Sequence, residues 1–135
     1  AYDAQFSLYY AVAASLLRGR FGLGELDDDA LADPAIRALA ARVRFAPDPT
    51  SAYPQSYSGA LAIRLRDGRR IERRQQVNRG AAGNPLTVDD VVAKFRDNAA
   101  RAVAPAQAAR ILDAVMALAS APDLGTLVAA LRPEP

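Results

Sequence analysis

The sequence predicts an α+β domain: a small antiparallel sheet with a central β-hairpin, flanked by about three helices before it and three after it. Two patterns lead to this fold class. Apolar residues recur every three or four positions up to about residue 43 and again from about residue 88, which is the periodicity of helices. Between these stretches the apolar positions alternate, as they do in strands. Helices and strands that occupy separate runs of sequence are typical of α+β domains.

The first expected helix covers residues 3–18, with Asp3 as its N-cap and Gly19 at its end. Its apolar face is formed by residues that are three and four positions apart, and these are Phe6, Tyr9, Tyr10, Ala13, Leu16 and Leu17.

Two shorter helices are expected next. The acidic residues 27–29 mark the start of the first of them, since negative charge stabilises a helix N-terminus. Asp33 followed by Pro34 marks the start of the second, which should end near Arg42. Residues 43–45 are β-prone and predict a short extended segment.

The hairpin is the strongest local prediction. In the first expected strand, which starts near residue 60, the apolar residues Leu61, Ile63 and Leu65 alternate with Ala62, Arg64 and Arg66. Asp67-Gly68 follows as a two-residue turn signal, which predicts a type I′ turn, and residues 71–77 run back as the second strand.

Basic residues are concentrated on the hairpin. Between residues 64 and 79, seven Arg stand against Asp67 and Glu72, a local charge of +5 in a chain whose net charge is +2. Such a concentration invites a nucleic-acid or anion-binding interpretation. However, the alternation directs Arg64 and Arg66 to the solvated face, and the hairpin has no aromatic residue on which bases could stack. We expect no nucleic-acid binding, while docking of an acidic partner on the Arg-rich face stays open as an alternative function.

Three helices are expected after the hairpin. Thr87 and Asp90 have the spacing of a capping box, opening a helix that ends near Ala100. Pro105 opens the next helix, and the last one follows Pro122. Each should bury one stripe: Val88, Val91, Val92 and Phe95 in the first; Ala108, Ile111, Leu112, Val115 and Leu118 in the second; Leu124, Leu127, Val128 and Leu131 in the third.

The composition excludes several kinds of chemistry. The chain has no Cys and no His, so it lacks disulfides, thiol nucleophiles, the commonest metal ligand and the commonest general base. Three consecutive Asp at residues 27–29 point in divergent directions on a helix, and no further oxygen ligands follow at calcium-loop spacing. We therefore predict no metal and no cofactor. No apolar stretch approaches the roughly 18 residues of a membrane span, so no membrane association is expected.

Two separated segments carry a family resemblance. The first is Asp3-Ala4-Gln5-Phe6-Ser7-Leu8-Tyr9-Tyr10-Ala11, and the second combines Arg79-Gly80, Asn84-Pro85-Leu86-Thr87 and Lys94-Phe95. In this order and spacing they resemble the carboxyl-terminal domain of the MmgE/PrpD family. The resemblance covers residues 3–98, and the helical tail from about 101 to 135 is more variable.

The resemblance implies an enzyme that acts on small polycarboxylates by moving a proton beside a carboxylate. Members of the family, which include 2-methylcitrate dehydratases and cis-aconitate decarboxylases, are cytoplasmic and metal-independent. Residues 1–135 would then be a single domain, the carboxyl-terminal α+β domain of a longer two-domain protein. Its expected partner is the amino-terminal helical domain of that protein, which carries the family's K-x-Y-P-x-C motif. We expect this chain by itself to be inactive, and a homo-oligomer is compatible with these expectations.

The resemblance also implies candidate site residues. Tyr10 matches the family's Tyr in S-x-x-Y and is the candidate catalytic residue, as a hydroxyl donor or general acid; the alternative is a core aromatic. Ser7 lies one turn earlier, as a candidate substrate-binding residue or a helix cap. Arg79 is the candidate clamp for a substrate carboxylate. Gln5 stands where some members have Lys, and Lys94 is expected to cover the helix surface or pair with the carboxylate four residues earlier.

Overall fold

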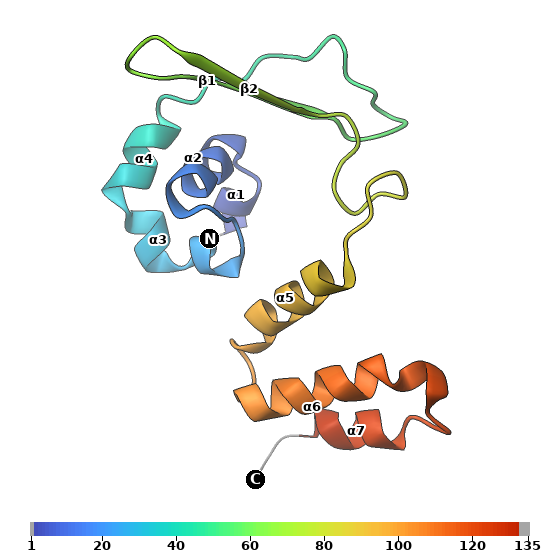
Figure 1. Cartoon of the computed structure of the whole chain (residues 1–135). Helices are drawn as coiled ribbons and strands as arrows, with labels where there is room; N and C mark the ends of the chain where they lie inside the picture. The colour runs from blue at the N-terminus through green and yellow to red at the C-terminus, as the bar shows by residue number, and fades with distance from the viewer. Residues whose placement is uncertain (1, 133–135) are drawn as a thin grey trace. The chain divides into compact units, whose positions relative to one another are not determined.

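Residues 2–132 are described by the computed structural model of this chain, which Figure 1 shows as a ribbon. The chain forms two compact units, the first ending at Pro49 and the second beginning at Thr50. The first unit is helical, and the second contains a β-hairpin followed by helices. The α+β fold class is therefore confirmed. Over the described range four α-helices precede the hairpin, rather than about three, and three follow it.

The helices of the first unit are short. They are α1 (Tyr2–Gln5), α2 (Leu8–Arg18), the 3-10 helix η1 (Leu23–Leu26), α3 (Asp28–Ala32) and α4 (Pro34–Ala40).

The single helix expected over residues 3–18 is wrong, because the chain forms two helices there. Ser7 has an extended backbone (φ −84°, ψ 105°), and its side-chain oxygen accepts a hydrogen bond from the backbone N–H of Tyr10 at 3.3 Å. Ser7 is thus the N-cap of α2, a position that short hydroxyl side chains favour. Asp3, expected as the N-cap, lies inside α1. The predicted end is confirmed, since Gly19 has the left-handed backbone (φ 73°) typical of a helix C-terminus.

The start of α4 is also confirmed. The Asp33 side chain accepts a hydrogen bond from the backbone N–H of Ala35 at 2.8 Å, and Pro34 occupies the first turn. The helix ends at Ala40, two residues before the expected end. Residues 43–45 belong to no strand of the described chain, because the two strands present pair only with each other. A β-prone segment without a partner strand has no ladder to join.

The core of the first unit lies where α2 packs against α4. Ala13, Ala14 and Ile36 are inaccessible to solvent, and Tyr10 is nearly so. Alanine side chains let the two helices approach closely, and Ile36 fills the space between them. The buried face is narrower than the predicted one, because these large apolar residues are exposed: Phe6, Tyr9, Leu16 and Leu17.

The hairpin consists of β1 (Gly59–Arg64) and β2 (Arg70–Gln75), paired antiparallel. Leu61 and Ile63 are half-buried while the alternate residues of β1 are exposed, which confirms the predicted alternation. All of β2 is exposed. The hairpin therefore has one partly covered side and one solvated side.

The turn differs from the predicted type I′, which requires positive φ at both central residues. In the described chain only glycines have positive φ, so Asp67 keeps an ordinary backbone while Gly68 has φ 87°. The Gly68 N–H donates to the carbonyl of Leu65 at 3.2 Å, and the Leu65 N–H donates to the carbonyl of Arg69 at 2.8 Å. The loop thus has three residues, 66–68. A turn followed by a left-handed glycine is the usual form of such loops.

The helices of the second unit are α5 (Val88–Ala99), α6 (Pro105–Met116) and α7 (Gly125–Leu131), with the 3-10 helix η2 (Leu118–Ser120) before the last. The capping box of Thr87 and Asp90 is confirmed, as is Pro105 in the first turn of α6. None of the helices between residues 2 and 132 has the length and apolarity needed to cross a bilayer.

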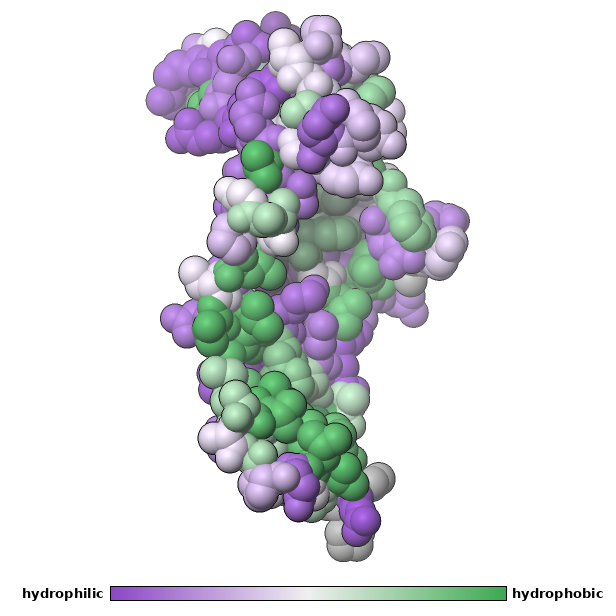
Figure 2. Space-filling view, turned by 90° about the vertical axis from the view of Figure 1, so that its right-hand side faces the viewer, coloured by the Kyte–Doolittle hydropathy of each residue, from purple (hydrophilic) through white to green (hydrophobic). Residues whose placement is uncertain are grey.

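The second core lies between α6 and α7. It consists of Ile111, Ala114 and Ala130, with Phe95 and Leu127 packed against them. The predicted stripes are wrong in part, because these members are exposed: Val88, Val91, Val115, Leu118, Leu124, Val128 and Leu131. Ala114 and Ala130 make the close contact between α6 and α7, and these larger apolar side chains next to it remain exposed to solvent. Figure 2 shows the resulting hydrophobic surface over α6 and α7, in the lower part of the view.

Candidate functional site

Tyr10 is a buried residue of α2. Its hydroxyl donates a hydrogen bond to the backbone carbonyl of Glu25 at 2.5 Å, and its ring meets the ring of Phe21 edge-on, with centroids 6.1 Å apart. Burial raises the pKa of the Tyr10 hydroxyl. The hydroxyl therefore keeps its proton at neutral pH and can act as a hydrogen-bond donor or acid.

Ser7 lies one turn before Tyr10 and is half-buried. Its oxygen accepts the Tyr10 N–H, so its observed role is to cap α2. The Ser7 side chain is thus hydrogen-bonded to the backbone of Tyr10 at the start of α2. If the Ser7 side chain rotated toward a ligand, α2 would lose this cap.

Glu25 was not singled out from the sequence, although it is the most buried charged residue of the described chain. Its carboxylate accepts hydrogen bonds from the Gly22 N–H at 2.9 Å and from Nε of Arg20 at 3.2 Å. Only the Glu25 half of a capping box is present, because Gly22 has no side chain to accept a hydrogen bond in return, so the sequence carries no clear signal for it. Glu25 fixes the η1 turn whose carbonyl accepts the Tyr10 hydroxyl, so it positions Tyr10.

Arg79 lies in the loop before α5 and is largely exposed. Its guanidinium forms an ion pair with Asp90. That guanidinium, together with the Thr87 N–H, lowers the pKa of Asp90 to about 2. A guanidinium has five N–H donors, so one ion pair does not exhaust its capacity to bind a carboxylate.

Gln5 and Lys94 are both exposed. Gln5 is the last residue of α1. Lys94 lies in α5, one turn after Asp90, whose carboxylate is engaged by Arg79 and by the Thr87 backbone. This arrangement leaves Lys94 to cover the helix surface, one of its two expected roles.

The structure brings Tyr10 and Ser7 together in the first unit and places Arg79 in the second. Within residues 2–132 no three His, Cys, Asp or Glu side chains are grouped in a way that could hold a metal ion. The catalytic role of Tyr10 and the binding roles of Ser7 and Arg79 stay predictions.

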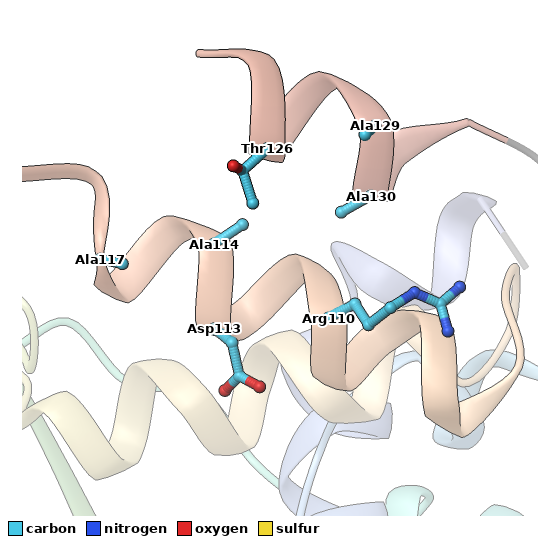
Figure 3. Close-up of a pocket in the computed structure, with 7 residues that line it drawn as sticks. All are labelled: Arg110, Asp113, Ala114, Ala117, Thr126, Ala129 and Ala130. Atoms are coloured by element: carbon cyan, nitrogen blue, oxygen red, sulfur yellow. The ribbon is translucent and has the colours of Figure 1, made fainter. Parts of the chain in front are cut away.

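A groove of about 490 Å³ lies between α6 and α7. Figure 3 shows Ala114, Thr126 and Ala130 directed into the space between the helices, while the carboxylate of Asp113 points away from α7. The groove is lined mainly by alanine and contains none of the predicted site residues. We assign no chemistry to it.

Comparison with known proteins identifies the family. Residues 1–119 match the family model described as the MmgE/PrpD C-terminal domain. The chain belongs to the MmgE/PrpD family. This confirms the resemblance drawn from the two sequence segments, and it extends the match from residue 98 to residue 119. Ser7, Tyr10 and Arg79 all lie within the matched residues of this MmgE/PrpD domain, whereas α7 lies beyond them.

A curated relative of this MmgE/PrpD domain is the 2-methylcitrate dehydratase of Cupriavidus necator. It is 35% identical over 124 residues, which cover 83% of this chain and 25% of the relative. The chain thus spans about a quarter of the length of that dehydratase.

Proposed function

We propose that this chain is the carboxyl-terminal, lid-like domain of an enzyme that eliminates water from a small polycarboxylate of the 2-methylcitrate type. The observation that carries the proposal is the 35% identity with a 2-methylcitrate dehydratase over most of the chain, together with the family match. A cytoplasmic location and a mechanism without a metal are part of the proposal, because the family resemblance implies both.

The proposed reaction is a β-elimination. A general base removes the proton from a carbon next to a carboxylate, and the C–H electron pair becomes the second bond of a C=C double bond. The C–O bond on the neighbouring carbon breaks, and the hydroxyl leaves as water after it receives a proton from a general acid. The carboxylates that do not react must be held by cationic or hydrogen-bond-donating groups.

The side chains of this chain are better suited to donate a proton or a hydrogen bond than to remove a proton from the substrate. A phenol with a pKa of 10 or above keeps its proton at neutral pH, so Tyr10 can act as a hydrogen-bond donor or acid. To act on a substrate, the Tyr10 hydroxyl must break its hydrogen bond to the Glu25 carbonyl and donate to a substrate oxygen instead. Arg79 is exposed and suits the binding of a carboxylate. With no His and one Lys, the chain leaves the general base to a second domain, and we propose the family's amino-terminal helical domain as that partner.

The first test compares this 135-residue chain with the complete protein that contains it. Both are incubated with 2-methylcitrate, and formation of the C=C bond is followed by ultraviolet absorbance. We expect turnover by the complete protein and none by the chain alone. Turnover that scales with the concentration of the isolated chain would refute the need for a second domain, and an inactive complete protein would refute the substrate class.

The second test concerns Arg79 in the complete protein. Arg79→Gln should raise KM by about tenfold or more if the guanidinium binds a substrate carboxylate. Asp90→Asn is the matched control, because it removes the same ion pair but leaves the guanidinium in place. Equal effects of the two variants on KM would show that Arg79 acts only by holding Asp90.

A further inference from the structure

The strand register gives the hairpin one cationic side. In an antiparallel pair, residues directly opposite each other point to the same side of the sheet. The pairs Arg64 with Arg70, Ala62 with Glu72 and Ala60 with Arg74 therefore share one side, which we call the Arg face. Leu61 with Arg73 and Ile63 with Ile71 lie on the other side, so three of the four strand Arg are on the Arg face.

Charge on the Arg face is poorly compensated. Arg64 stands directly opposite Arg70, and like charges in that position destabilise a sheet. Arg70 pairs with Glu72, whereas among the described residues neither Arg64 nor the neighbouring loop residue Arg66 pairs with a carboxylate. All four side chains are exposed. An anion that binds here would relieve the repulsion between Arg64 and Arg70.

The dimensions of the face favour an extended polyanion. Residues on one side of a strand recur about every 6.8 Å, and a six-residue strand is about 20 Å long. Along β2 this spacing separates Arg70, Glu72 and Arg74, so an extended peptide with carboxylates on alternate residues can place one carboxylate opposite each Arg. The residues proposed for the substrate site, Ser7, Tyr10 and Arg79, all lie outside the two hairpin strands, so this surface is distinct from that site.

We propose that the Arg face docks an acidic segment of a partner protein in an extended conformation. A nucleic acid fits less well, because proteins that bind single strands stack the bases on aromatic side chains and residues 59–75 contain none.

The test uses the 135-residue chain and a fluorescein-labelled peptide of about twelve residues in which Glu and Thr alternate, about 40 Å long when extended. Binding is measured by fluorescence anisotropy at about 50 and about 150 mM salt. We expect binding that weakens as salt rises, and no binding of the peptide in which Gln replaces Glu. Equal binding of the Gln peptide, or tighter binding of oligo-dT than of the Glu peptide at the higher salt, would overturn the proposal.

Variants locate the site. The triple variant Arg64→Gln, Arg66→Gln, Arg70→Gln should weaken binding of the Glu peptide by about tenfold or more. The control Arg42→Gln, Lys94→Gln, Arg96→Gln removes the same charge from exposed positions outside the hairpin and should change the affinity by less than about twofold. Equal losses in the two variants would show only non-specific attraction.

A measurement on the unmodified chain covers the case in which the triple variant does not fold. Amide resonances of the chain are recorded with and without the Glu peptide. The proposal requires the largest shifts within residues 59–75, and shifts concentrated elsewhere would overturn it.

Discussion

Tyr10 and Glu25 form a small polar network inside an apolar helix contact. The Tyr10 hydroxyl donates a hydrogen bond to the carbonyl of Glu25, while the Glu25 carboxylate accepts hydrogen bonds from the Gly22 N–H and the Arg20 guanidinium. Every buried side-chain polar atom of the described chain has a partner. Because an unpaired buried group costs more than a hydrogen bond gains, this network specifies how η1 sits on α2.

Tyr10→Phe removes the hydroxyl and leaves the Glu25 carbonyl without this donor. We expect the free energy of unfolding to fall by about 1 kcal/mol. Urea unfolding followed by circular dichroism measures it. Tyr9→Phe is the control, because the Tyr9 side chain is about half exposed, and it should change stability by less than about 0.5 kcal/mol. Equal effects of the two variants would mean that the Tyr10 hydrogen bond adds nothing.

The raised pKa of Tyr10 predicts how stability responds to alkaline pH. A group whose folded pKa exceeds its unfolded value, about 10 for Tyr, contributes stability below that value and loses it as pH rises through the folded pKa. The wild-type chain should therefore lose more stability than Tyr10→Phe above pH of about 10. Parallel stability curves for the two proteins would contradict the shift.

At the scale of elements, the side chain of Asp90 connects the start of α5 to the loop that precedes this helix. Its carboxylate accepts the Thr87 N–H at 3.0 Å, closing the capping box of α5, and also pairs with Arg79 in the preceding loop. The Thr87 hydroxyl oxygen accepts the Asp90 N–H at 3.1 Å in return. One side chain thus fixes both the start of α5 and the direction from which the loop approaches it.

Asp90→Asn tests this junction through pH. The folded pKa of about 2 lies below the ordinary value of about 3.9. A depressed pKa contributes stability above the unfolded value and loses it as pH falls to the folded one. Wild type should therefore be more stable than Asp90→Asn at neutral pH, and the difference should shrink between pH of about 4 and about 2.

Thermal unfolding across that range measures the difference between the two proteins. Asp89→Asn, an exposed neighbour in the same first turn, is the control and should show a smaller dependence on pH. A gap between wild type and Asp90→Asn that stays constant down to pH of about 2 would argue against the ion pair and the cap.

The hairpin loop depends on Gly68. An added Cβ would meet no atom within 4 Å, so the cost of Gly68→Ala comes only from its backbone at φ 87°. We expect a loss of about 1–2 kcal/mol in the free energy of unfolding. Gly59→Ala has equally open space without a positive φ and should be neutral or slightly stabilising. Similar stabilities of the two variants, measured by denaturant unfolding, would contradict the three-residue loop.

At the scale of the whole molecule, each unit has a small core and a large apolar surface. The core of the first unit consists of Tyr10, Ala13, Ala14 and Ile36. Around it, Tyr2 and Phe6 remain 73% and 71% exposed, with their ring centroids 5.2 Å apart. Exposed apolar groups that gather on one surface mark sites of contact with another protein.

We therefore expect the isolated chain to self-associate through the exposed apolar residues of α1, of α2 and of the turn between them, which contains Phe6. Sedimentation velocity over a range of concentrations measures it, and Phe6→Ser with Leu17→Ser should shift the chain toward monomer. Phe45→Ser is the control, since Phe45 is similarly exposed but follows α4 in the chain and belongs to neither α1, α2 nor the turn between them. A wild-type chain that stays monomeric at about 100 μM would refute the prediction.

The sequence by itself determined the features that depend on near neighbours. The capping box at Thr87, the proline starts of α4 and α6, the left-handed Gly19 and the alternation of β1 each rest on contacts within a few residues. The two family segments could be recognised for the same reason, because residue order alone carries them.

Only the tertiary structure decided what each side chain meets across longer separations. It paired Tyr10 with Glu25 and Arg79 with Asp90. It also set alanines beside Ile36 at one helix contact and beside Ile111 at the other, and left many of the larger apolar residues exposed. Helical periodicity predicts which residues share a face, but the partner helix selects which part of that face is buried, and that selection depends on packing between distant segments.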